Sequence, residues 1–115
     1  MVLIASDKPH RYSNLALNKL MDHQVPVVPI GRRASEVRGL TFHTGQPLFD
    51  DIHTITLYLN PVNQLPFYDY ILNIKPKRVI FNPGTENREL QGMLDEHSIS
   101  WEESCTLVLL STDQF

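Results

Sequence analysis

The sequence predicts an α/β protein with a mainly parallel sheet of five to six strands, because short apolar runs alternate with helical patterns. Residues 2–5 form an apolar run without alternation, which is typical of a strand covered on both faces. From Leu15 to Met21 the apolar residues instead recur at the spacing of one helical face. The same succession of strand and helix follows twice more, so we expect βαβ units with right-handed crossovers.

The bounds of the individual elements are predicted from short apolar patterns and from the proline and asparagine residues beside them. Pro66 is tolerable only in the first turn of a helix, so the second helix should begin near Asn63. Asn87 is a suitable N-cap for the third helix. The apolar tail at 105–110 fits a buried strand and a short packed helix equally well. The strands are expected at 2–5, 25–30, 54–59 and 77–81, with shorter ones at 40–42, at a sheet edge, and at 98–102.

Length and composition limit the classes of function. A chain of 115 residues, 42% hydrophobic and 20% charged, is expected to form a single domain over residues 1–115. The net charge of -3 provides no general attraction to nucleic acid, so we expect no nucleic-acid partner. The apolar runs are too short to span a membrane and no secretory signal is recognisable, so we expect no membrane association and a cytoplasmic location.

Metal binding is not expected from the sequence. Cys105 is the only cysteine, which excludes an internal disulfide and a cysteine-based zinc site. The five histidines are scattered, without the i, i+4 pairs or neighbouring carboxylates of metal sites.

A ligand crevice is expected where the parallel strands end. In such sheets ligands bind outside the carboxyl ends of the strands, near the point where the strand order reverses. This rule selects four segments: Ser6 to Tyr12, Gly31 to Arg33, Asn60-Pro61 and Asn82-Pro83-Gly84. The first contains several hydrogen-bond donors and leads into a helix N-terminus, which favours an anion, although a solvated polar turn is the simpler interpretation.

The segment Gly31 to Arg33, together with the first turn, indicates which kind of nucleotide the crevice would suit. The first turn lacks the glycines of a typical NAD site, and the second strand ends in Arg32-Arg33 instead of an acidic residue. Paired arginines suit a phosphate on the adenosine ribose, which both NADP and coenzyme A (CoA) carry. A solvated loop would explain the two arginines as well.

The chain resembles the small stand-alone CoA-binding proteins, which are related to the CoA-binding domain of the succinyl-CoA synthetase alpha subunit. The resemblance runs nearly end to end. Its best segments are residues 5–12, 28–30, 36–40 and 82–87, and Cys105 lies where many members have a cysteine. Members usually have glycine in place of Ile4, His10 and Ser13, and Asn-Pro in place of Gly31-Arg32.

The resemblance implies a Rossmann-like, three-layer αβα fold with a CoA site at the strand ends. The residue after the second strand, Arg32 or Arg33, would bind the adenosine phosphate. Asn82, Pro83 and Gly84 would close the crevice, and Gly31 belongs to the same group of site residues. Residues of the first loop would line the pyrophosphate and pantetheine, and those after the third long strand would flank the adenine: Ser6, Lys8, Pro9, Arg11 and Tyr12, then Leu59, Asn60 and Pro61.

The leading interpretation is therefore a non-catalytic module that binds CoA or acyl-CoA. No catalytic residue is expected, since Asp50-Asp51 fit a polar turn and Cys105 fits a packed small hydrophobe. One alternative is a ligand-free domain of the same fold that serves protein interaction, as a homodimer or with an unidentified partner. Another is NADP-type nucleotide binding. A crevice filled by Ile4, His10 and Tyr12 would favour the ligand-free domain.

Overall fold

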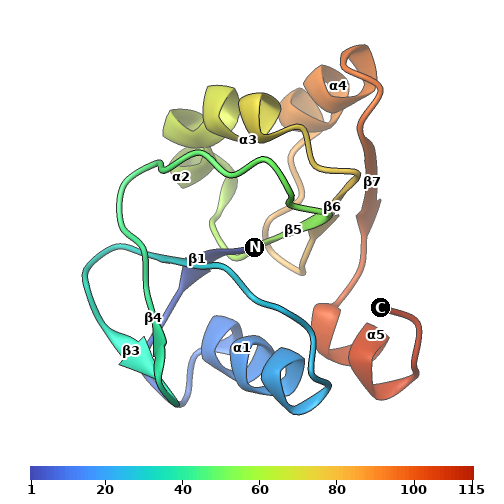
Figure 1. Ribbon diagram of the computed structural model, residues 1–115. Coiled ribbons are helices and arrows are strands. Elements are labelled where there is room, and N and C mark those ends of the chain that lie inside the picture. Colours follow the sequence, from blue (N-terminus) through green and yellow to red (C-terminus); the bar gives the residue numbers. More distant parts are fainter.

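The protein is built on a five-stranded parallel sheet with the strand order β2-β1-β5-β6-β7 (Figure 1). The computed structural model describes residues 1–115. This sheet confirms the predicted α/β, Rossmann-like fold. Its strands are β1 (Val2–Ala5), β2 (Pro29–Gly31), β5 (Thr54–Leu57), β6 (Arg78–Phe81) and β7 (Ser100–Glu103).

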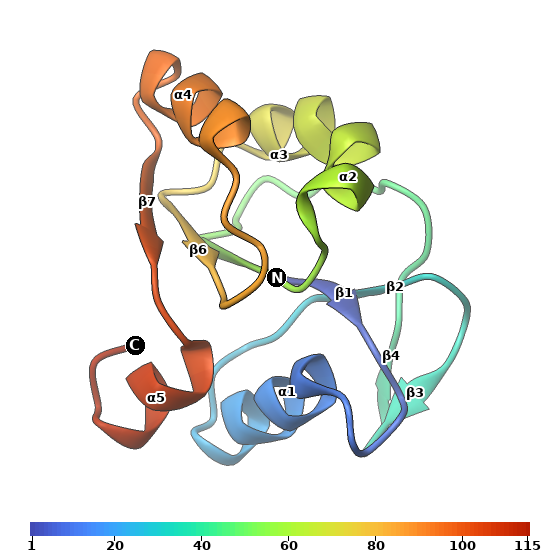
Figure 2. The same cartoon turned by 180° about the vertical axis from the view of Figure 1, so that it is seen from behind.

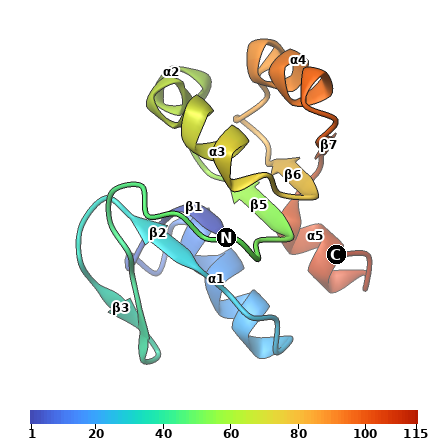
Figure 3. The ribbon, with the colours of Figure 1, turned by 45° about the horizontal axis from the view of Figure 1, so that its top comes forward.

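Helices cover both faces of the sheet and complete three layers. The elements α1 and α5 lie on one face, while α2, α3 and α4 lie on the other (Figures 1 and 3). None of these helices combines the length and apolar character needed to cross a membrane. The helices are α1 (Tyr12–Asp22), α2 (Pro61–Gln64), the 3-10 turn η1 (Leu65–Phe67), α3 (Tyr68–Ile74), α4 (Arg88–Glu96) and α5 (Thr106–Ser111).

The sheet separates two apolar cores, one under each helical layer. The larger core joins alternate residues of β5 and β6, such as Ile55 and Phe81, to Ile71 of α3 and Leu94 of α4. The smaller core packs Val2 and Ala5 of β1 against α1 and α5, with members Leu17, Leu20, Phe42 and Leu110. Successive side chains of a strand point to opposite faces, so β1 contributes Leu3 to the larger core and Val2 to the smaller one.

The strand order reverses between β1 and β5. From β1 the chain passes through α1 to β2 on one side, and then returns past β1 to form β5 on the other side. This reversal creates the switch point at which open parallel sheets bind ligands. The carboxyl ends of β2, β1, β5 and β6 therefore stand next to one another at one edge of the molecule.

The predicted edge strand at 40–42 is instead part of a separate hairpin. The strand β3 (Glu36–Val37) pairs antiparallel with β4 (Leu40–Thr41). Arg38 and Gly39 form the turn with positive φ angles, as tight hairpin turns require. The guanidinium Nη1 of Arg38 lies 2.8 Å from the Asp22 carboxylate, so the hairpin is anchored to α1. Beyond the hairpin, only His43 forms a bridge to the main sheet, beside Ile30.

Two further predicted boundaries are wrong, one because of a helix cap and one because of proline. The helical segment begins at Pro61, not near Asn63, because the Asn60 side chain caps it by accepting from the Asn63 amide. Pro66 lies in the 3-10 turn η1 between α2 and α3, where its missing N–H is tolerated. The strand predicted at 25–30 contains only Pro29 to Gly31, since the preceding proline-containing segment runs outside the ladder.

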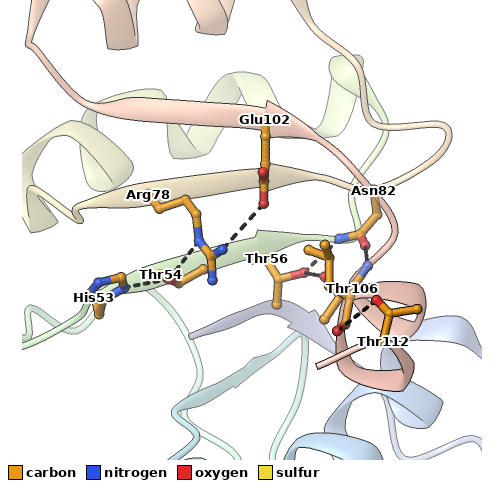
Figure 4. Close-up of polar contacts among 9 residues, drawn as sticks. His53, Thr54, Thr56, Arg78, Asn82, Glu102, Thr106 and Thr112 are labelled. Atoms are coloured by element: carbon orange, nitrogen blue, oxygen red, sulfur yellow. Dashed lines mark hydrogen bonds and ion pairs between the residues drawn. The ribbon is translucent and has the colours of Figure 1, made fainter. Parts of the chain in front are cut away.

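The apolar tail forms the helix α5, and buried polar contacts fix where it begins. The amide of Thr106 donates to Asn82 Oδ1 at 2.9 Å, and the Thr106 hydroxyl lies 2.7 Å from that of Thr56 (Figure 4). The same figure shows Arg78 between Thr54 and Glu102, nearer the amino ends of the strands. The contacts of Thr106 with Asn82 and Thr56 therefore accompany a helix and not a buried strand, the two interpretations that the apolar pattern of the tail leaves open.

Replacing Gly31 by alanine is expected to destabilise the protein. A Cβ atom at this position would lie 2.7 Å from Phe42 Cδ2 and 3.1 Å from the Arg33 carbonyl oxygen. Phe42 is buried, so Gly31→Ala should reduce the free energy of unfolding by about 1–3 kcal/mol through overpacking. Urea denaturation measures this loss. Gly92→Ala is the control, because Gly92 has open space on an exposed helical face, and an equal loss in both variants would contradict the packing explanation.

Candidate functional site

An open crevice of about 580 Å³ lies at the carboxyl ends of β2, β1, β5 and β6. It brings together residues from all four of the segments that the sequence singled out. Those that line it are Ser6, Lys8, Arg11 and Tyr12 after β1, Arg32 and Arg33 after β2, Leu59 and Asn60 after β5, and Pro83 and Gly84 after β6.

Four of the residues expected at the site lie outside the lining of this crevice. Pro9 is exposed in the first loop, and Pro61 begins α2. Gly31 borders a neighbouring hollow. Asn82 is only 2% exposed, and its side-chain amide donates to Thr56 Oγ1 at 2.7 Å and to the Leu57 carbonyl at 2.8 Å. Asn82 therefore holds the ends of β5 and β6 and the start of α5 together.

The first loop is ordered by its own hydrogen bonds. Ser6 Oγ accepts from the Lys8 amide at 3.1 Å, and the Ser6 carbonyl accepts from the buried Asn14 side chain at 2.9 Å. Arg11 is the N-cap of α1 but forms no side-chain capping bond, and the first helical turn holds no acidic residue. The helix N-terminus therefore faces the crevice without a side chain that competes for an anion.

Positive charge is concentrated in this crevice although the chain is acidic overall. Lys8, Arg11, Arg32 and Arg33 all line it, and none of them forms an ion pair. The ion pairs of the molecule join Arg38 to Asp22 and Arg78 to Glu102, away from this lining. The arrangement suits a ligand with several negative charges, because guanidinium and ammonium groups bind phosphate oxygens through charge-assisted hydrogen bonds.

Asp7 is the one acidic residue of the lining, and it accepts a hydrogen bond from Ser35 in the loop after β2. Ser35 Oγ donates to Asp7 Oδ2 at 2.6 Å. This hydrogen bond lowers the pKa of the Asp7 carboxyl below its usual range, and the nearby charges of Arg33 and Lys8 lower it further. Asp7 is therefore ionised at neutral pH, within hydrogen-bond reach of the loop that carries the arginines.

Replacing Ser35 by alanine is expected to raise the pKa of Asp7 toward its ordinary value of 3.8. The hydrogen bond favours the ionised form, so the stability it contributes is present above about pH 4 and is lost as the pH falls through the lowered pKa. Carbon-detected NMR titration of the Asp7 carboxyl measures the change. Ser35→Thr retains a hydroxyl and should keep the low pKa; an unchanged pKa in Ser35→Ala would contradict the assigned cause.

Sequence reasoning missed several lining residues. Asp7 lies inside the selected segment Ser6 to Tyr12 but was not among the expected ligand contacts, and Tyr58 directly follows β5, so the strand-end rule could have selected it. Ser35 and Phe42 flank the hairpin; Phe42 belongs to the strand predicted at 40–42, but no pattern predicted that this segment reaches the crevice. Burial raises the pKa of Tyr58 to about 12, with the Thr106 and Thr56 hydroxyls partly opposing the shift. Its phenol is protonated at neutral pH.

Ile4 borders both the crevice and a second hollow of about 400 Å³. Ile4, Arg32 and Leu59 border both spaces, and Phe67, Pro66 and Asn63 line the second one. His10 lies outside both linings, and Tyr12 is 72% exposed at the edge. The crevice is thus open, since Ile4 and Tyr12 border it without filling it and His10 lies outside it.

No group of three or more His, Cys, Asp or Glu side chains in residues 1–115 is placed to hold a metal ion.

The fold and this crevice define an α/β protein with a crevice lined by cationic side chains at the switch point of a parallel sheet. The chain belongs to the CoA-binding domain family, whose description is "CoA binding domain" and whose model matches residues 1–111. A comparison with curated proteins found no match.

Solved structures share the architecture. The crystal structure of an uncharacterized protein is 47% identical, with a TM-score of 0.95, and the match covers 99% of this chain and 94% of the other. A hypothetical protein from Pyrococcus horikoshii OT3 is 26% identical, with a TM-score of 0.79 and coverages of 94% and 78%. A protein from Thermus thermophilus, at 18% identity, a TM-score of 0.84 and coverages of 99% and 87%, shows the same fold alone.

Proposed function

We propose that the protein binds CoA or acyl-CoA, without catalysis, through a single domain over residues 1–115. The observation that carries the proposal is the open crevice with four cations free of ion pairs, at the switch point of a CoA-binding domain. CoA carries a pyrophosphate and a ribose phosphate. Four cationic side chains and a free helix N-terminus suit that distribution of charge.

The adenosine end of the ligand fits the side of the crevice near β2. In this proposal Arg32 and Arg33 bind the ribose phosphate. Arg32 also borders the second hollow, whose apolar walls at Phe67 and Leu59 suit an adenine ring. Leu59, Asn60 and Pro61 then flank the base, as the family resemblance implies.

The remaining parts of the ligand extend across β1 toward β6. Ser6, Lys8 and Arg11 lie where the pyrophosphate meets the N-terminus of α1. The pantetheine arm follows the wall formed by Tyr58 and the segment from Pro83 to Thr85.

Backbone NMR spectra recorded during a CoA titration test this assignment. We expect saturable shifts of amide resonances in residues 6–13, 31–35, 58–60 and 83–85. The amides of Arg78 and Lys77, at the amino end of β6, serve as internal reference and should not shift. Shifts that cluster at the reference residues, or no shifts at millimolar CoA, would contradict the proposed site.

The open crevice favours ligand binding over the ligand-free alternative, in which Ile4, His10 and Tyr12 would fill the space. NADP is the second candidate ligand, because Arg32 and Arg33 would suit a phosphate on either ribose hydroxyl. Competition between CoA and NADP in the same titration separates the two. We further propose that the protein is cytoplasmic and that it signals the binding of acyl-CoA to a second copy of the chain or to a partner protein.

A further inference from the structure

The carboxylate of Asp7 needs an explanation in a crevice suited to phosphate. An anion among the cations should repel a phosphate ligand unless it has another task. Its hydrogen bond to Ser35 connects residues 28 positions apart in the sequence. Figure 2 shows that the loop after β1, which contains Asp7, runs beside the β3–β4 hairpin that follows Ser35.

This contact joins the two loops that carry the cations. Lys8 and Arg11 lie in the loop after β1, and Arg32 and Arg33 lie between β2 and Ser35. The strands β1 and β2 are paired as far as Ala5 and Gly31. Beyond that pair, the Ser35–Asp7 contact is the hydrogen bond that connects the two loops.

Ser35 is well placed to fix the arginine loop. Its carbonyl accepts from the Phe42 amide at 2.9 Å, and Phe42 is buried in the core beside α1. The hairpin that follows is anchored to α1 by Arg38. The arginine loop is therefore held by β2 before it and by Ser35 after it, and the Asp7 contact sets its distance from the first loop.

We propose that the Ser35–Asp7 hydrogen bond is a positioning contact, which holds Arg32 and Arg33 beside Lys8 and Arg11 so that one ligand can contact both loops. This inference rests on the proposed function. A loop that is ordered before binding does not lose conformational freedom when the ligand arrives, so affinity is higher than with a mobile loop. A net hydrogen bond of ordinary strength corresponds to roughly a three- to ten-fold effect on affinity.

Three variants distinguish a positioning role of the Ser35–Asp7 contact from an effect of the Asp7 charge. Ser35→Ala removes the contact and keeps the carboxylate, and it should weaken CoA binding about three- to ten-fold. Asp7→Asn keeps an oxygen that accepts from Ser35 but removes the charge, so its affinity should equal or exceed that of the wild type. Ser35→Thr retains the hydroxyl and should bind CoA within about two-fold of the wild type. Dissociation constants from calorimetry supply the comparison.

If Asp7 acted only by repelling phosphate, Ser35→Ala would leave the affinity unchanged and Asp7→Asn would tighten it. That pattern overturns the inference. A second readout does not depend on the ligand: the backbone order parameters of residues 32–35 should fall in Ser35→Ala and stay high in Ser35→Thr. Absence of CoA binding by the wild type would reject the proposed function, whereas unchanged order parameters in Ser35→Ala would reject the positioning contact itself.

Discussion

Replacing Arg32 and Arg33 together by alanine is expected to weaken CoA binding by about two orders of magnitude, because each charge-assisted hydrogen bond contributes roughly 1.5–3 kcal/mol. The affinity for dephospho-CoA, which lacks the ribose phosphate, should change much less. The difference in affinity between CoA and dephospho-CoA should therefore nearly disappear in the double variant. Isothermal calorimetry of both ligands with the wild type and with the variant measures these affinities.

The control for this experiment removes two positive charges elsewhere. Lys75→Asn with Lys77→Ala changes the net charge by the same amount at the amino end of β6. Asparagine tolerates the positive φ of position 75, so the control should not strain the backbone. An equal loss of affinity in the control would show that the arginines act only through the overall field of the protein.

Replacing Asn82 by alanine is expected to lower the free energy of unfolding by about 2–4 kcal/mol, since each buried partner of its amide would lose a hydrogen bond. Figure 4 shows Asn82 beside two of these partners, Thr56 Oγ1 and the Thr106 amide, and the third is the Leu57 carbonyl. Urea denaturation measures the change. Asn73→Ala, at an exposed position of α3, is the matched control and should be nearly neutral.

A loss below about 0.5 kcal/mol in Asn82→Ala, comparable to ordinary surface substitutions, would contradict the structural role of this side chain. A strong loss of CoA affinity without loss of stability would instead favour the direct ligand contact that the family resemblance implied for Asn82.

Periodicity in the sequence predicted most of the fold because the strands are short, apolar and separated by helices. The first strand and helix, the Asn87 cap and the strand near residue 100 are all present. The short strand predicted at 40–42 is present as β4, but its partner β3 was missed, since it is only two residues long and the local polarity resembles that of a loop. The tail could not be assigned because a six-residue apolar helix and a buried strand share one pattern.

The strand-end rule predicted where the crevice lies but not how each side chain points. Asn82 directly follows β6, yet alternation along the strand turns it toward the face of Ile80, away from the face of Val79 and Phe81. The Ser35–Asp7 contact could not be predicted from the sequence. It depends on a hairpin that carries residue 35 back to the first loop, which is a property of the folded chain.

Calorimetric titration of the purified protein with CoA, with dephospho-CoA as the comparison ligand, tests the central claim most directly. We predict saturable one-site binding of CoA and an affinity for dephospho-CoA that is weaker by about tenfold or more, as expected for a phosphate held by arginine. The absence of any heat of binding at millimolar CoA would contradict the account.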